Sequence, residues 1–164
     1  MHRAHIQKRA VRRRDLMRRI LFVLALPALI CSCGWPIKTP NGFAVLENPR
    51  PFAYHAVSDD GCHIAVEHMK GAEGADLRYW ANSLKRQLVE IRGYKLVEET
   101  GFTTESGSDG RLLVTRADYG GRAQTFLVAL VMDGEDVWVL KAAGPEETMK
   151  EKRSVILAAF KTVD

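Results

Sequence analysis

The sequence predicts an α+β domain in which an antiparallel sheet is covered by two helices. Three observations support this prediction: segments that alternate apolar and polar residues, one long amphipathic stripe with helical spacing, and short glycine-rich breaks between the later segments. Breaks this short permit only hairpins, because parallel strands need a longer crossover. The expected order of elements is β-β-α-β-β-β-β-α, and the helices complete a two- or three-layer sandwich.

The first two strands are expected at 52–57 and 62–69, on either side of the turn Ser58-Asp59-Asp60-Gly61. Asp-Gly is typical of such a turn. In the second segment Cys62, Ile64 and Val66 share one face, and His63, Ala65 and Glu67 share the other. This two-residue period predicts a half-buried strand.

The helix expected at 76–92 has the most regular pattern in the chain. Asp76 suits the N-cap and Gly93 suits the position after the last helical residue. The apolar stripe predicted to face the sheet consists of Leu77, Trp80, Ala81, Leu84, Leu88 and Ile91.

Four further strands are expected at 94–100, 111–118, 123–132 and 137–143, as an antiparallel meander. Gly144-Pro145-Glu146-Glu147 then predicts the start of a last helix, with Pro145 at its first position and acids in its first turn. The predicted buried side of this helix consists of Met149, Ile156, Phe160 and Val163, widened by Val155, Leu157 and Ala159.

The charges of the chain are unevenly distributed. The 164 residues include 24 basic and 20 acidic ones, a net charge of +4. Residues 1–33 contain eight of the basic residues and a single acid, which leaves 16 basic and 19 acidic residues, a net charge of −3, for residues 34–164. The expected domain is therefore mildly acidic, and we expect no nucleic-acid partner.

The start of the chain has the pattern of an export signal. Met17-Arg18-Arg19 precedes an apolar run of eleven residues, 20–30. A helix that crosses a bilayer needs roughly 20 such residues, so the run fits the apolar region of a signal peptide instead. Residues 1–16 are explained either by a true start at Met17 or by a long basic region before the run. An uncleaved apolar anchor is the alternative interpretation.

The run ends in Ile30-Cys31-Ser32-Cys33-Gly34, which resembles the lipobox of a bacterial lipoprotein. The resemblance implies that residues 1–32 are a signal peptide, that Cys33 carries a diacylglyceryl group, and that its new amino group is acylated, for example with palmitate. Cys31 fits poorly, because Ile30 would then stand at the cut. Gly34 in place of Asp implies the outer membrane, facing the periplasm, over the inner membrane.

Residues 34–51 contain Pro36, Pro40, Pro49 and Pro51. Proline prevents helices and interrupts strands. We therefore expect residues 33–51 to be the lipidated cysteine and a tether, with a brief extended piece at 43–46, and residues 52–164 to be a single domain.

The layout of the domain resembles the PsbP/Mog1/DcrB-like fold, which occurs in small bacterial lipoproteins and secreted proteins. The likeness rests on the pair Tyr79-Trp80, the joint Arg92-Gly93-Tyr94-Lys95-Leu96 and the joint at Gly144. It implies binding, assembly or chaperoning, although a fold alone does not determine function.

No catalytic set stands out, and we expect no catalytic residue, metal or cofactor. Cys62 and His63 are neighbours on one strand, so their side chains diverge, whereas a nucleophile and its base need hydrogen-bond reach. Cys62 is expected to be a buried apolar residue. The odd spacing of His63 and His68 places them on opposite faces. The glycines at 107, 110, 120 and 121 are expected in turns.

The sequence thus predicts a lipid-anchored protein of the cell envelope, held to the membrane through Cys33, with a non-enzymatic domain that binds a protein partner or assists assembly. Tyr79 and Trp138 are the candidate binding residues, while Trp80 is expected in the core. The alternatives are an envelope hydrolase whose site is assembled only by folding, and a carrier of a small ligand or lipid. The oligomeric state is left open.

Overall fold

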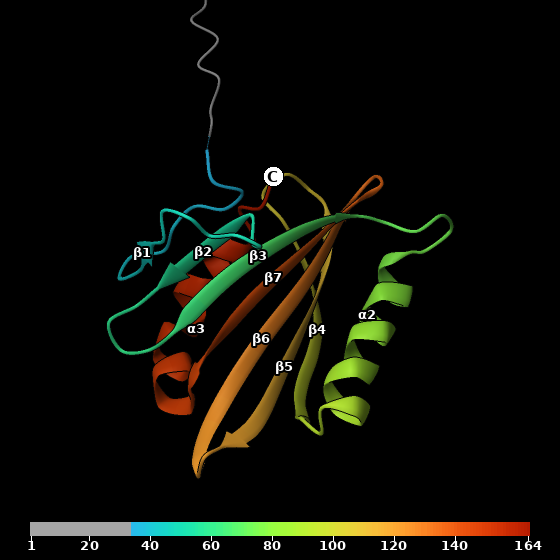
Figure 1. The fold of residues 1–164 in the computed structure, drawn as a ribbon. Helices are drawn as coiled ribbons and strands as arrows, with labels where there is room; N and C mark the ends of the chain where they lie inside the picture. The colour runs from blue at the N-terminus through green and yellow to red at the C-terminus, as the bar shows by residue number, and fades with distance from the viewer. Residues whose placement is uncertain (1–33) are drawn as a thin grey trace, which may run out of the picture. The chain divides into compact units, whose positions relative to one another are not determined.

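The computed structural model describes residues 34–164 and contains seven strands, two α-helices and one π-helical turn (Figure 1). None of these helices is long and apolar enough to cross a membrane. The elements are β1 (Ala44–Val45), β2 (Tyr54–Val57), β3 (His63–Lys70), α2 (Leu77–Arg86), the π-helical turn η1 (Gln87–Ile91), β4 (Lys95–Thr103), β5 (Asp109–Tyr119), β6 (Arg122–Asp133), β7 (Asp136–Pro145) and α3 (Glu146–Phe160).

All seven strands form one antiparallel sheet in the order β1-β2-β3-β7-β6-β5-β4. The predicted meander is confirmed, because β4, β5, β6 and β7 are neighbours in chain order. Strand β3 pairs with β7, which joins the first hairpin to the meander. The short strand β1 was expected only as an extended piece, and it adds an edge strand next to β2.

The two helices lie on opposite faces of the sheet, so the domain has three layers (Figure 1). Successive side chains of a strand point to opposite faces, and β6 shows this directly. Leu127, Ala129 and Val131 belong to the core under α3. Val128 and Leu130 belong to the smaller core under α2. Both faces of the central strands are therefore apolar.

Helix α2 begins as the sequence predicts and ends differently. Asp76 is the N-cap, and its carboxylate accepts a hydrogen bond of 2.7 Å from the backbone N–H of Tyr79. After Arg86 the α-helix passes into η1, which the apolar spacing did not predict. Gly93 follows with a φ of +71°, as expected for the residue after a helix.

Helix α3 confirms the predicted acids in the first turn, Glu146 and Glu147. Pro145 is the N-cap and the last residue of β7, not the first helical residue, since its ψ of 140° is still extended. Val155, expected to widen the buried side, is 39% exposed. The buried residues of α3 are Met149, Ile156, Ala159 and Phe160.

The proline-rich segment expected as a tether is in contact with the domain. Ile37 is 2% exposed and belongs to the core under α3. The backbone N–H of Lys38 donates a hydrogen bond of 2.8 Å to Thr162 Oγ1, and that of Asp164 donates one of 3.3 Å to the carbonyl of Pro36. Residues 34–164 together form one compact unit with its own core.

Candidate functional site

The candidate site is a groove on the α2 face of the sheet. Helix α2 and η1 lie over the meander, and the β2–β3 side of the same face is left open (Figure 1). Between them is an open pocket of about 360 Å³, within the range of about 300–1,000 Å³ typical of small-molecule sites. Its floor is low because Ala65 of β3 and Ala143 of β7 carry only methyl side chains.

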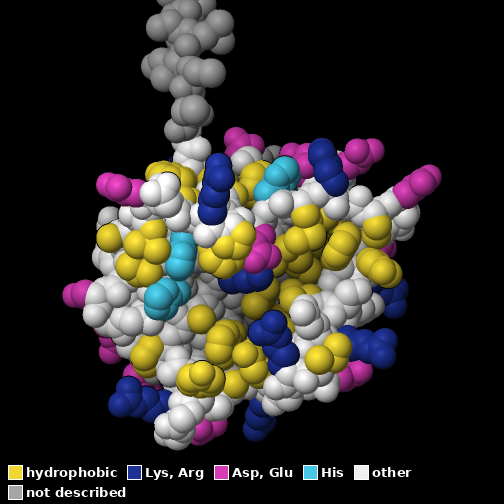
Figure 2. All heavy atoms as spheres, in the orientation of Figure 1, with side chains coloured by type: hydrophobic (Ala, Val, Ile, Leu, Met, Phe, Trp, Pro, Cys, Tyr) yellow, Lys and Arg dark blue, Asp and Glu magenta, His cyan; other side chains and the backbone are white. Residues whose placement is uncertain are grey.

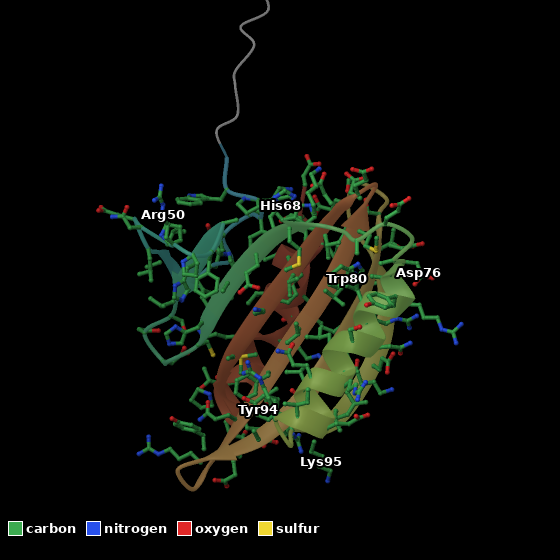
Figure 3. The ribbon with its side chains drawn as sticks, turned by 45° about the vertical axis from the view of Figure 1, so that its right-hand side comes forward. Arg50, His68, Asp76, Trp80, Tyr94 and Lys95 are labelled. Atoms are coloured by element: carbon green, nitrogen blue, oxygen red, sulfur yellow. The ribbon has the colours of Figure 1, made fainter. Side chains whose placement is uncertain are left out.

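Most of the pocket wall is apolar. Tyr94 and Phe126 stack with their ring centroids 4.9 Å apart, and both line the groove. Figure 3 shows Tyr94 between the sheet and the end of α2 that lies away from Asp76. The other large apolar residues of the wall are Phe52, Leu84, Leu88 and Val128.

The polar part of the wall is basic. It contains Arg92, Lys141, His55 and His63, together with the neutral Gln87, and it includes no aspartate or glutamate. Lys141 is paired with Glu67 at 2.7 Å. Within residues 34–164, Arg92 and the two histidines form no ion pair. On the face drawn in Figure 2, histidine side chains gather beside hydrophobic and basic ones.

His55 and His63 are brought together by the first hairpin. Their ring centroids are 5.8 Å apart, since His55 pairs with Ala65 and His63 pairs with Val57, which makes the two histidines diagonal neighbours on one face. Burial lowers the pKa of His55, and the charge of His63 lowers this pKa further. An anion bound beside the pair would act in the opposite direction.

The π-helical turn places Arg92 at the pocket. The backbone N–H of Arg92 donates a hydrogen bond of 3.1 Å to the carbonyl of Gln87, five residues back, not four. The wider turn changes which residues face the sheet. Leu84, Leu88 and Arg92 line the pocket, and Ile91 is 74% exposed. The prediction that Ile91 lies on the buried stripe is therefore wrong, because regular helical spacing does not continue past Arg86.

The two predicted binding residues are not brought together, and neither lines the pocket. Tyr79 is 57% exposed on α2, with its ring edge against Trp80. Trp138 is half-buried on the α3 face, where His68 stacks on it at 4.2 Å between centroids. The roles of Tyr79 and Trp138 stay predictions. Cys33, the predicted lipidation site, lies outside the described residues.

The predicted divergence of Cys62 and His63 is confirmed. Cys62 is fully buried in the core under α3, and His63 lies on the opposite face in the pocket wall. Burial raises the pKa of the Cys62 thiol, and the nearby Asp60 carboxylate raises this pKa further. Cys62 is thus held as a neutral thiol. His63 and His68 also lie on opposite faces, as their odd spacing predicts.

Sequence reasoning missed both the histidine pair and Arg92 as site residues. The pair has a detectable signal, because residues 55 and 63 have the same parity and lie on either side of the turn at 58–61. Arg92 has none, because the apolar spacing continues smoothly to Ile91 and does not reveal the π-helical turn.

No protein-family model matches the sequence, and neither does any curated protein sequence. Similarity appears at the level of structure. The cyanobacterial PsbP protein CyanoP of Synechocystis sp. PCC 6803 superposes with a TM-score of 0.59 at 9% identity, over 77% of this chain and 83% of CyanoP. LpqN of Mycobacterium tuberculosis, described as involved in cell envelope biogenesis, gives a TM-score of 0.53 at 15% identity, over 78% of each chain. The domain therefore has a PsbP-like α+β fold, as its layout predicted.

Proposed function

We propose that this chain is a lipid-anchored protein of the cell envelope whose domain binds a ligand in the groove between α2 and the β2–β3 hairpin. The function is binding, not turnover. On this proposal the membrane is the first partner, reached through acyl chains on Cys33. The exposed Tyr79 stays our candidate for a contact with an envelope protein.

The anchor rests on the pattern of residues 17–34. A short basic stretch, an eleven-residue apolar run and Ser32 before Cys33 together resemble a lipoprotein signal. Two or more acyl chains hold a protein stably at a membrane, while one chain holds it only marginally. The fold shared with LpqN, a protein of envelope biogenesis, agrees with an envelope location. Gly34 after the cysteine favours the outer membrane facing the periplasm.

One observation supports binding most directly: the groove combines a mostly apolar wall with three basic side chains, Arg92, His55 and His63, that form no ion pair within residues 34–164. Such a combination is typical of ligand sites, where a few polar groups orient a molecule held mainly by apolar contact. A hydrolase of the Ser-His or Cys-His kind needs a nucleophile beside its base. The groove offers two histidines, but its wall contributes no serine, threonine, cysteine or carboxylate.

The anchor is tested by replacing Cys33 with serine in the full chain, expressed in a bacterium that processes lipoproteins. We expect Cys33→Ser to abolish labelling by a clickable palmitate analogue and to move the protein from the membrane to the soluble fraction, since serine provides no thiol for acylation. Separating inner and outer membranes on a density gradient reads out the membrane of the unsubstituted chain.

The matched control is Cys31→Ser, two residues earlier in the same segment. It is expected to leave labelling and fractionation unchanged, because position 31 fits the lipobox poorly. Labelling that persists in Cys33→Ser and disappears in Cys31→Ser would move the anchor to Cys31. Palmitate labelling that persists in both variants, or that is absent from the unsubstituted chain, would remove the lipid anchor from the proposal.

A further inference from the structure

We infer that the groove takes a single-chain anionic amphiphile, with a carboxylate or phosphate headgroup among the basic residues and its acyl chain along the apolar wall. This inference rests on the proposed function only in taking the groove to be the binding site. It adds the chemical class of the ligand.

The headgroup follows from the charges around the groove. Residues 34–164 carry a net charge of −3, yet the wall contains Arg92, His55 and His63 and no acid, while the charge of Lys141 in the same wall is balanced by Glu67 beside it. Arg92 forms no ion pair within the described residues, and a guanidinium can bind a carboxylate or phosphate with two hydrogen bonds. These basic groups favour an anion in the groove over a neutral molecule of the same size.

The histidines support the same headgroup. Their rings lie 5.8 Å apart, and the pKa of His55 is lowered by burial and by its neighbour's charge. Placing two imidazolium groups so close without a counterion is unfavourable. A bound anion would relieve this repulsion and would accept hydrogen bonds from both rings.

The chain follows from the apolar wall. Leu84 and Leu88 lie on the helix side and Val128 lies on the sheet. The stacked pair Tyr94 and Phe126 adds two aromatic rings to the same wall. These residues offer no hydrogen-bonding groups apart from the Tyr94 hydroxyl, so a free inorganic anion would leave most of the groove unused. Each methylene buried there is expected to raise affinity about fourfold.

The volume of the pocket indicates how many acyl chains the ligand has. A volume of about 360 Å³ is near the lower end of small-molecule sites. This volume suits one acyl chain with its headgroup. The small side chains of Ala65 and Ala143 let the acyl chain of the ligand lie on the surface of the sheet, over the paired strands β3 and β7.

The test uses residues 34–164, which form a compact unit with its own core and lack the basic leader that would itself attract anions. Three probes are titrated by calorimetry: decyl phosphate and the neutral decyl maltoside, each below its critical micelle concentration, and inorganic phosphate. We expect one molecule of decyl phosphate to bind per domain. The other two probes are expected to bind at least about tenfold more weakly, because decyl maltoside lacks the anionic group and inorganic phosphate lacks the alkyl chain.

Two variants separate the halves of the site. Arg92→Gln is expected to weaken decyl phosphate about tenfold and to leave decyl maltoside unchanged, since only the charge is lost. Ala143→Leu fills the floor and is expected to weaken both amphiphiles. The matched controls are Arg78→Gln, at an exposed position of α2, and Ala123→Leu, at an exposed position of β6; both lie outside the pocket wall. Thermal unfolding verifies that each variant is folded.

The outcomes distinguish the ligand class from the site. If decyl maltoside binds as tightly as decyl phosphate and Ala143→Leu abolishes its binding, the groove is a ligand site and the anionic class is wrong. If inorganic phosphate binds as tightly as decyl phosphate, the inference that the groove binds an acyl chain is wrong. If Arg78→Gln weakens decyl phosphate as much as Arg92→Gln does, the binding is general attraction and the inference fails. If the folded domain binds none of the three probes, the groove itself fails as the binding site, while the test of Cys33 stands independently.

Discussion

Replacing Phe160 with alanine is expected to lower the free energy of unfolding of residues 34–164 by about 3–5 kcal/mol. Phe160 is 1% exposed in the last turn of α3, and it belongs to the core that also contains Tyr54 and Ile156. Truncation removes an apolar ring from this core and leaves a cavity that a sheet-backed site cannot close. Urea unfolding followed by circular dichroism measures the change.

The control on the same helix is Val155→Ala, at a position that is 39% exposed. Its stability is expected to stay within about 0.5 kcal/mol of the unsubstituted chain. Equal losses at positions 155 and 160 would contradict the packing of α3 described above.

Replacing Gly144 with alanine is expected to cost about 1–3 kcal/mol through overpacking. A methyl group at this buried position would lie 2.6 Å from the Sγ of Cys62 and 3.1 Å from its Cα. Because Gly144 is near the end of β7, just before α3, the strain falls where the sheet connects to the helix. Chemical denaturation gives the size of the effect.

The cause is isolated by a double-mutant cycle with Cys62→Ala, which removes the sulfur. The double variant is expected to be more stable than the sum of the two single losses predicts, by about 0.5–3 kcal/mol, because the closest clash is gone. As a comparison, Gly101→Ala on the edge strand β4 meets its nearest atom only at 3.8 Å. That change is expected to stabilise the domain by up to about 1 kcal/mol. A cycle with no coupling would mean that the sulfur does not cause the loss at position 144.

Much of the fold could be predicted from the sequence where one physical pattern governs a whole element. The N-cap Asp76 and the glycine at 93 delimit the helical segment, and alternation in 62–69 identifies β3 with the correct inward face. The predicted breaks at 119–122 and 133–136 are short enough to determine the meander. These features are determined by residues that are close together in the sequence, so they can be predicted from the sequence alone.

The remaining features depend on contacts between distant segments. Ile37 lies in a proline-rich stretch with no periodicity, and only the complete core reveals where it packs. The π-helical turn exposes Ile91 and presents Arg92 to the groove, a choice that the spacing of apolar residues does not record. The candidate site could not be predicted for the same reason, since its wall combines residues from β2, β3, η1, β6 and β7.

The hydrogen bonds between residues 36–38 and 162–164 have a mechanical consequence. A force applied through residue 34 would act first on the contacts Asp164–Pro36 and Lys38–Thr162 and on the two-residue pairing of β1 with β2. The long ladders of β5, β6 and β7 would be reached only after these had broken. A pulling force at residue 34 is therefore expected to break these few N-terminal contacts first, while the strands that form the groove remain paired.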